Sequence, residues 1–385
     1  MNYYLIAGEA SGDLHGSNLI REIKKLDGIA NIRCWGGDMM EEQGATLVKH
    51  YRDLAFMGFI EVVRNLRTIF TNLKFCKEDI LAFKPDAVIL IDYPGFNMRI
   101  AAWAKKHNIP VIYYISPQIW AWKENRVKQI RVTVDKMLVI LPFEKAFYKK
   151  WNFEVEYVGH PLVDVIEQKM SEAQTPATQV SPLQDEHIVA ILPGSRKQEV
   201  LKKLPVMLEA SRQFPDYRFI VAKASSLPDE FYQPFLTAFP QMRTIRNNTY
   251  TLLMQAKAAL VTSGTATLET ALFGVPQVVC YKGSTLSYQI AKRLIKVKYI
   301  SLVNLIMNKP VVKELIQGEM NAGNIRTELA RILHDETRIL EIRKDYAALK
   351  QLLSEGGNAS QKAAKSIVEF MKSRINAGTR RTSAA

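Results

Sequence analysis

The chain has 385 residues, 48% of them hydrophobic, and this length favours two domains over a single core. Its apolar runs are far shorter than the ~18 residues that cross a bilayer, and the N-terminus does not read as a signal peptide. Three widely spaced cysteines argue against a disulfide framework and favour a reducing cytoplasm, while the net charge of +14 favours partners that carry phosphate.

Strand-like apolar runs alternate with helical stretches along the first part of the chain. These runs are 2–8, 87–92, 110–116, 136–142 and 155–160. After a polar segment with two prolines the alternation resumes, with runs at 188–194, 218–224, 258–264 and 276–281. Near-continuous apolar strands between helices predict parallel sheets covered on both faces.

We therefore expect an α/β protein with two doubly wound, Rossmann-like domains that face a cleft. The N-terminal domain spans 1–170, the linker 171–187 and the C-terminal domain 188–350. A helix over 351–375 could cross back or exchange between copies, and 376–385 reads as a disordered tail. Ligands of such sheets bind at the carboxyl ends of the strands, so the loops there are the candidate sites.

The first candidate loop, "AGEASGDLHG", follows the first strand and spaces Gly8, Gly12 and Gly16 by four residues. It matches neither common nucleotide-binding glycine motif. Its backbone N–H groups could hold an anion or a sugar hydroxyl at a helix N-terminus. A tight turn capped by Ser11 or Asp13 explains the same residues equally well.

The second loop, "IDYPGFN", ends a strand of five apolar residues on Asp92. A carboxylate at the end of a core strand is a plausible general base. Asp92 could instead cap a helix that starts near Pro94.

The third and fourth loops belong to the second domain. In "LPGSRKQEV", Gly194, Ser195 and Arg196 precede a helix, which is a suitable diphosphate site. Its alternative is a capping box between Ser195 and Gln198.

In the fourth loop, "VTSGTATLET", Ser263, Gly264 and Thr265 open another helix, and Glu269 follows about one turn later. A carboxylate there can accept hydrogen bonds from a ribose diol; the alternative is a solvated helix residue. The chain has no Asp-x-Asp and no Cys or His cluster, so we expect neither a metal nor another cofactor.

Segment 58–77 has helical periodicity with a wide apolar arc flanked by basic residues, which is typical of an interfacial helix. An ordinary helix packed on the sheet is the alternative. The expected membrane-facing residues are Phe59, Ile60, Val62, Val63, Leu66, Arg67, Ile69, Phe70 and Leu73.

Several of these motifs together resemble the lipid-A-disaccharide synthase family of bacterial GT-B glycosyltransferases. The matching segments, in family order, are "AGEASGDLHG", "LAFMGFIEV", "KPDAVILIDYPGFN", "YYISPQIWAW", "LPFEKAFY", "VGHPLVD", "LPGSR", "SGTATLE" and "YISLVNL". The resemblance implies an inverting transfer from UDP-2,3-diacylglucosamine to the 6-hydroxyl of 2,3-diacylglucosamine 1-phosphate. The products would be the β-1′,6-linked lipid A disaccharide 1-phosphate and UDP, formed at the cytoplasmic face of the inner membrane.

The resemblance also assigns residues by motif. Asp92 matches the proposed base, Arg196 the arginine at the diphosphate, and Asn304 an asparagine near the UDP. The donor set is Gly194, Ser195, Arg196, Ser263, Gly264, Thr265, Glu269 and Asn304. The acceptor or cleft set is Glu9, Ser11, Asp13, Asn97 and Ser116.

One position departs from the family pattern. Family members commonly carry a second acid in this loop, where the present chain has Gly95, so Asp92 is the only acid of the loop. A mechanism that needs both carboxylates is therefore in doubt for this chain.

Other classes of function remain as alternatives. Another UDP-N-acetylglucosamine enzyme of the same fold, a muramyl transferase or a 2-epimerase, would act on substrates without acyl chains. A nucleic-acid-binding protein would need a basic stripe or a known module, which the dispersed Lys and Arg residues do not form. A membrane-peripheral scaffold without activity is a third alternative. We expect a peripheral membrane protein without nucleic acid, and a homodimer is conceivable.

Overall fold

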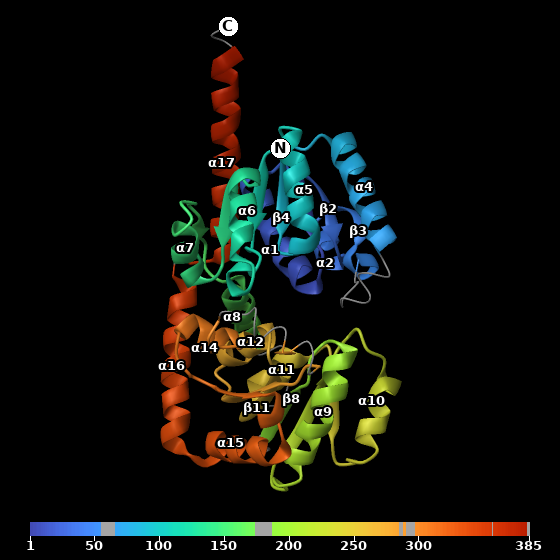
Figure 1. Ribbon diagram of the computed structural model, residues 1–385, viewed down its shortest axis with the longest axis vertical. Helices are drawn as coiled ribbons and strands as arrows, with labels where there is room; N and C mark the ends of the chain where they lie inside the picture. The colour runs from blue at the N-terminus through green and yellow to red at the C-terminus, as the bar shows by residue number, and fades with distance from the viewer. Residues whose placement is uncertain (55–65, 174–186, 285–287, 290–296, 356, 383–385) are drawn as a thin grey trace. The chain divides into compact units, whose positions relative to one another are not determined.

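The computed structural model describes residues 1–54, 66–173, 187–284, 288–289, 297–355 and 357–382. The chain divides into two compact units, Met1–Pro161 with Ser354–Ala385, and Leu162–Leu353. Each unit is built on one parallel sheet with helices between the strands (Figure 1). The expected fold class is therefore confirmed.

The first unit contains a seven-stranded sheet in the order β3-β2-β1-β4-β5-β6-β7. Its strands are β1 (Asn2–Ala7), β2 (Asn31–Gly36), β3 (Thr46–His50), β4 (Ala87–Ile91), β5 (Val111–Tyr114), β6 (Lys136–Val139) and β7 (Glu156–Tyr157). Its helices are α1 (Ala10–Leu26), α2 (Asp38–Glu42), α4 (Leu66–Phe83), α5 (Pro94–Lys106), α6 (Val127–Thr133), α7 (Pro142–Lys149) and α17 (Ala359–Thr382). Short 3₁₀ turns lie at Tyr51–Leu54, Ile119–Ala121 and Glu124–Arg126.

The second unit contains a six-stranded sheet in the order β10-β9-β8-β11-β12-β13. Its strands are β8 (Ile188–Leu192), β9 (Arg218–Lys223), β10 (Arg243–Arg246), β11 (Ala258–Thr262), β12 (Gln277–Tyr281) and β13 (Lys313–Ile316). Its helices are α8 (Pro161–Ala173), α9 (Lys197–Ser211), α10 (Asp229–Leu236), α11 (Thr249–Gln255), α12 (Thr265–Leu272), α14 (Leu302–Met307), α15 (Ala322–His334) and α16 (Glu336–Ser354), with a 3₁₀ turn at Gln317–Glu319.

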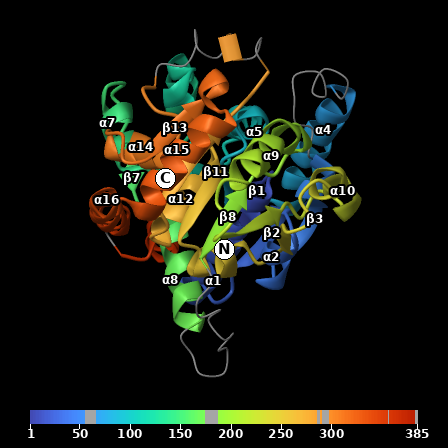
Figure 2. The same cartoon turned by 90° about the horizontal axis from the view of Figure 1, so that it is seen from below.

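The order of strands fixes where each sheet can bind a ligand. In the first sheet β1 and β4 are neighbours, and the chain winds outward from them in opposite directions. In the second sheet β8 and β11 have the same relation, and Figure 2 shows them next to one another. The crevice at such a switch point, outside the carboxyl ends of the strands, is where open α/β sheets bind ligands. The loops after β1, β4, β8 and β11 are therefore the four candidate loops of the sequence.

The apolar strands fill the core of each unit because both faces of each sheet are covered. On one face of the first sheet, Tyr4, Ile6, Val88 and Leu90 pack in a cluster with side chains of α4, α5 and α6. Helix α1 approaches the sheet closely, since a Cβ on its Gly12 would lie 3.0 Å from the Cβ of Ala7. Gly12 of the first loop thus serves the close packing of α1 on the sheet.

The C-terminal helix belongs to the first unit, where α17 contacts α1. Ser366 donates a hydrogen bond to Glu156, and Arg374 forms an ion pair with Asp135 at 3.3 Å. In the structure the backbone of the expected tail is helical up to Thr382 and projects beyond the first sheet (Figure 1).

The boundary between the units also differs from the expected one, which placed 162–170 in the N-terminal domain. The structure divides the chain at Pro161, at the start of α8, because this helix packs with the second unit. An ion pair of 3.0 Å joins its Glu167 to Lys350 of α16. Most of the expected linker, 174–186, lies outside the described residues. None of the helices described is long and apolar enough to span a membrane.

Candidate active site

Asp92 lies at the carboxyl end of β4, at the switch point of the first sheet. Both Asp92 and Tyr93 have left-handed backbone conformations, with φ of +43° and +48°. Such conformations cost residues other than glycine on the order of 1–3 kcal/mol each, and they gather at functional sites. Tyr93 is the N-cap of α5 and Pro94 its first residue, so Asp92 itself does not cap the helix.

Buried neighbours hold the backbone of Asp92 in this conformation. The side-chain amide of Asn97 donates hydrogen bonds to the carbonyls of Asp92 (2.9 Å), Ile91 (3.2 Å) and Ile6 (3.3 Å). The Tyr113 hydroxyl donates to the Asp92 carbonyl at 2.6 Å. Asn97 is completely buried and positions the backbone of Asp92, while its expected place among the cleft residues stays a prediction.

The surroundings of Asp92 change its acidity. Burial, followed by the negative charge of Glu9, raises the pKa of Asp92 to about 7, against the lowering effect of the Tyr93 backbone N–H. Glu9 is the N-cap residue of α1 and follows β1, the neighbouring strand. A carboxylate with a pKa near neutrality is a stronger base than an ordinary one and is still largely ionised just above pH 7.

Sequence reasoning found Glu9 but missed its relation to Asp92. Asp92 is the one acid in the sequence of its own loop. The structure brings a second acid, Glu9, near it from the loop after β1. The pairing of β1 with β4 brings the two acids together, since parallel neighbours end at the same edge of a sheet. The sequence does not reveal this pairing directly.

Two other expected cleft residues form hydrogen bonds within the first unit. Asp13 is buried and accepts hydrogen bonds from the backbone N–H groups of Gly37 (2.8 Å), Met40 (3.1 Å) and Met39 (3.2 Å), which fixes the start of α2. Ser116 is also buried, and its hydroxyl lies 2.6 Å from that of Tyr148. The polar atoms that a ligand would need already have partners within the protein, and the expected contact of these two residues with a ligand stays a prediction. Ser11 is exposed in the first turn of α1.

Arg196 lies at the switch point of the second sheet, as the N-cap residue of α9. Its side chain is 57% exposed and lies 3.9 Å from Glu199, so its guanidinium is accessible to a ligand. Gly194 before it has φ of +114°, and a Cβ there would lie 2.5 Å from the Glu199 carboxylate. Ser195 is exposed, and the alternative capping box is not formed, because α9 begins at Lys197 without a side-chain cap.

The loop after β11 provides the second half of this site. Gly264 is the N-cap of α12 with φ of +146°, and Thr265 is the first helical residue; both are exposed. The Ser263 hydroxyl donates to the carbonyl of Ile300 at 2.9 Å. The open helix N-terminus presents backbone N–H groups, which suit a diphosphate.

Glu269 is partly buried on α12 and has a partner that the sequence did not reveal. The Tyr250 hydroxyl donates to its carboxylate at 2.9 Å, and burial raises the pKa of Glu269. A carboxylate held in this way keeps further lone pairs for the hydroxyls of a ribose. Tyr250 lies on α11, and no sequence spacing relates it to the motif.

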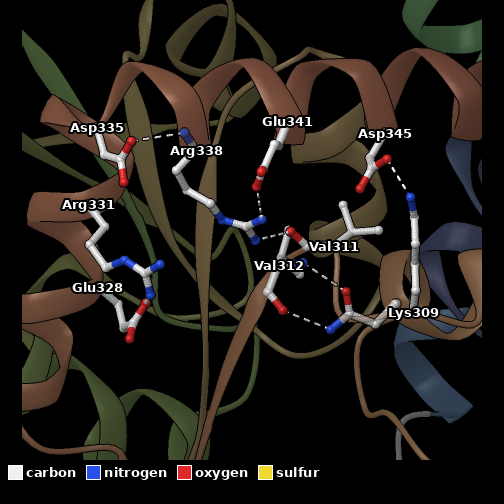
Figure 3. A network of polar contacts seen from close by, with 10 residues as sticks. Lys309, Val311, Val312, Glu328, Arg331, Asp335, Arg338, Glu341 and Asp345 are labelled. Carbon is white, nitrogen blue, oxygen red and sulfur yellow. Dashed lines mark hydrogen bonds and ion pairs between the residues drawn. The ribbon is translucent and has the colours of Figure 1, made fainter.

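Asn304 has a structural role, and its expected place beside a nucleotide stays a prediction. It is 1% exposed, its Oδ1 accepts from Val312 N–H at 2.9 Å, and its Nδ2 donates to the Val312 carbonyl at 2.8 Å. Helix α16 also contacts the segment that leads into β13 (Figure 3). Its Arg338 donates to the Val311 carbonyl, and its Asp345 forms an ion pair with Lys309. A cavity of 420 Å³ lies beside these residues.

The candidate membrane helix is described only in part, because Phe59, Ile60, Val62, Val63 and the side chain of Leu66 lie outside the described residues. Leu73 is 5% exposed and packs in the core cluster, with Ile69 packed against it. The expectation was wrong for these two residues, because the inner side of α4 covers the sheet. Arg67 is exposed, and Phe70 is 63% exposed.

Among the described residues, no cluster of three or more His, Cys, Asp or Glu side chains is placed to hold a metal ion. The groups placed for an anionic ligand are Arg196 and the open N-terminus of α12.

Comparison with solved structures defines the fold class of the protein. The chain is similar to the UDP-GlcNAc 2-epimerase from Neisseria meningitidis, with a TM-score of 0.68 and 14% identity over 96% of this chain and 100% of that one. It is also similar to the calicheamicin glycosyltransferase, with a TM-score of 0.60 and 16% identity over 97% and 98%. At this identity the likeness shows the fold alone, which is that of the GT-B enzymes.

The sequence comparisons are more specific. Residues 3–369 match the family model described as lipid-A-disaccharide synthetase. The lipid-A-disaccharide synthase of Syntrophus aciditrophicus is 41% identical over 96% of this chain and 98% of its own length, and that of Geobacter sulfurreducens is 39% identical over 96% and 97%. The chain belongs to the lipid-A-disaccharide synthase family, whose members are glycosyltransferases of lipid A biosynthesis.

Proposed function

We propose that the chain transfers 2,3-diacylglucosamine from UDP-2,3-diacylglucosamine to the 6-hydroxyl of 2,3-diacylglucosamine 1-phosphate. The bond between C1 of the donor sugar and the UDP oxygen breaks, and a bond from C1 to the acceptor O6 forms with inversion. Asp92 takes the proton of the acceptor hydroxyl, and UDP leaves with the bonding electron pair. The observation that carries this assignment is the strained, firmly held Asp92, whose pKa is raised to about 7.

The second unit supplies the groups for the donor in this proposal. Arg196 and the backbone N–H groups at the start of α12 meet the charge of the diphosphate, and Glu269 accepts hydrogen bonds from the ribose. Because a guanidinium and helix N-termini can meet this charge, we expect the reaction to proceed without a divalent cation.

The proposal is tested by incubating the protein with the acylated donor and acceptor and determining the mass of the lipid product. We expect the tetraacyl disaccharide 1-phosphate, formed equally well in the presence of a chelator. Efficient turnover of UDP-N-acetylglucosamine without acyl chains, and none of the acylated donor, would instead favour a different GT-B enzyme.

We also infer that the protein binds the cytoplasmic face of the inner membrane through the outward side of α4. Phe70 is 63% exposed on this side, with the exposed Arg67 and Lys74 beside it on the helix. An apolar ring flanked by cations is the pattern that an interface with anionic lipid favours. A homodimer that exchanges α17 stays a prediction.

Replacement of Phe70 by Ser should weaken binding to vesicles that contain phosphatidylglycerol by about tenfold or more, since burying a Phe side chain contributes ~1.5–3 kcal/mol. Cosedimentation with vesicles measures this effect. Leu340→Ser is the matched control, because Leu340 is equally exposed at 63% but lies on α16 of the second unit. Equal losses for both variants would contradict the assignment to α4.

A further inference from the structure

The segment between β5 and α6 carries two cations and an exposed tryptophan at the same edge of the first sheet as Asp92. β4 and β5 are paired with Ile91 opposite Tyr114, so the chain leaves both strands side by side. The backbone N–H of Asp92 reaches the carbonyls of Tyr114 and Ile115, at 3.3 and 3.2 Å. The residues that leave β5 therefore lie near the candidate base.

This segment is firmly anchored. Trp120 is buried, and its indole N–H donates to the buried carboxylate of Glu144 at 3.2 Å. Burial raises the pKa of Glu144 to about 7, while hydrogen bonds from Leu141 N–H and Trp120 act in the opposite direction. Together with the contact between Ser116 and Tyr148, these buried bonds fix the path of the chain up to Trp122.

Beyond this anchor, Trp122 is 47% exposed and holds two cations near its ring. The Lys123 Nζ lies 4.2 Å from the ring centroid and the Arg126 Cζ lies 5.8 Å from it. Over the described part of the chain, neither cation forms an ion pair with an acid. Desolvation and the charge of Arg126 lower the pKa of Lys123, so the two cations repel each other where they stand.

Arg126 is also close to the groups that hold Asp92. Burial, with the charges of Asp92 and Tyr148, raises the pKa of Tyr113 well above its usual value, and the charge of Arg126 acts against this rise. Tyr113 is the residue that donates to the Asp92 carbonyl at 2.6 Å. Arg126 thus lies within electrostatic reach of Tyr113, the residue that holds the backbone of the base.

We propose that Lys123 and Arg126 bind the phosphate monoester of the acceptor sugar while Asp92 addresses its hydroxyl at the other end of the same hexose. This inference rests on the proposed function for the identity of the acceptor. Two unpaired cations held close together are stabilised by a doubly charged anion, and a guanidinium is suited to bind phosphate oxygens. The pair is therefore a specificity element that selects phosphorylated acceptors.

The test compares two acceptors in the same detergent micelles, 2,3-diacylglucosamine 1-phosphate and the same lipid without its phosphate. Hydrogen bonds to charged groups are lost in the double variant Lys123→Gln, Arg126→Gln, so its KM for the phosphorylated acceptor should rise about 10- to 100-fold. Its kcat should change little, and its kinetics with the unphosphorylated acceptor should equal those of the unchanged protein. The double variant should therefore lose only its preference for the acceptor that carries the phosphate.

Lys149→Gln is the control, because this exposed lysine ends α7 and is therefore carried away from the carboxyl edge of the sheet. It should leave both acceptors unaffected. An unchanged preference in the double variant, or an equal loss on both acceptors, would overturn the proposal. The proposal would also fail if the double variant lost binding to phosphatidylglycerol vesicles and kept its acceptor preference, because the cations would then serve lipid headgroups.

A binding measurement separates this inference from the proposed function. Titration of soluble glucosamine 1-phosphate and of glucosamine, followed by NMR, needs no turnover. Preference for the phosphorylated sugar in the unchanged protein, and its loss in the double variant, would support the phosphate site even if no disaccharide formed. The same preference in both proteins would refute it.

Discussion

The loop after β4 in the first unit and the loop after β8 in the second both lie at the switch point of their sheet but are built differently. Asp92 is partly buried, strained, and held through its backbone by Asn97 and Tyr113. Arg196 is mostly exposed and forms an ion pair at 3.9 Å with Glu199. The strength of a general base depends on its pKa, and rigid, partly desolvated surroundings determine that pKa. A cation that binds phosphate must instead be free to exchange its partner for the ligand.

The largest effect should come from replacing Asp92 by Asn, which keeps the shape of the side chain and removes the base. We expect kcat to fall on the order of 10²- to 10⁴-fold, the usual contribution of general base catalysis. Titration calorimetry with UDP should show unchanged affinity, because the donor groups belong to the other unit. If the Asp92→Asn variant keeps its turnover, Asp92 is not the base, and the loop after β4 does not differ in function from the binding loop after β8.

Replacing Arg196 by Ala should have the next largest effect and the opposite pattern. The loss of charge-assisted hydrogen bonds to a diphosphate should weaken UDP binding about 10- to 100-fold. The pH profile of the remaining activity should be unchanged. Arg243→Ala is the matched control, since this exposed arginine starts β10 at the amino edge of the same sheet. A shifted pH profile in Arg196→Ala would show that the two loops are not separate in function.

The pH dependence of kcat/KM tests the raised pKa of Asp92 directly. Activity should increase with pH and level off above a midpoint of about 7, because the base must be ionised. Glu9→Gln should move this midpoint to lower pH, since it removes a negative charge that raises the pKa. Glu42→Gln, an exposed glutamate at the end of α2, should leave it in place. Equal midpoints in all three proteins would contradict the coupling of Glu9 with Asp92.

The smallest effect should come from Gly95→Asp, which supplies the second acid of the family pattern. A Cβ at this position meets no atom within 4 Å, and residue 95 lies in the first turn of α5. A negative charge at a helix N-terminus contributes about 0.3–1 kcal/mol, so the thermal unfolding temperature should rise slightly. Gly95→Ala separates this charge effect from helix propensity. A fall in unfolding temperature for the Asp variant alone would mean that the loop has no room for a second acid.

Much of the fold could be read from the sequence because parallel strands buried on both faces leave continuous apolar runs. The runs at 87–92 and 188–194 became β4 and β8, and the motif after each run became a loop at a carboxyl edge. The division of the chain was less legible. Where α8 and α17 pack depends on contacts with distant residues, such as Lys350 for α8 and Asp135 for α17.

The sequence by itself determined the two sheets, the four loops at their carboxyl edges, and the chemical types of residue that those loops present. Only the tertiary structure decided which polar residues are available to a ligand. The sequence does not distinguish Asp13, Asn97, Ser116 and Asn304 from Asp92 and Arg196 as candidate ligand contacts. In the structure, hydrogen bonds within the protein engage Asp13, Ser116, Asn304 and the Nδ2 atom of Asn97. The physical reason is that a buried polar group must find a partner inside the fold, and most such partners lie far away in the chain.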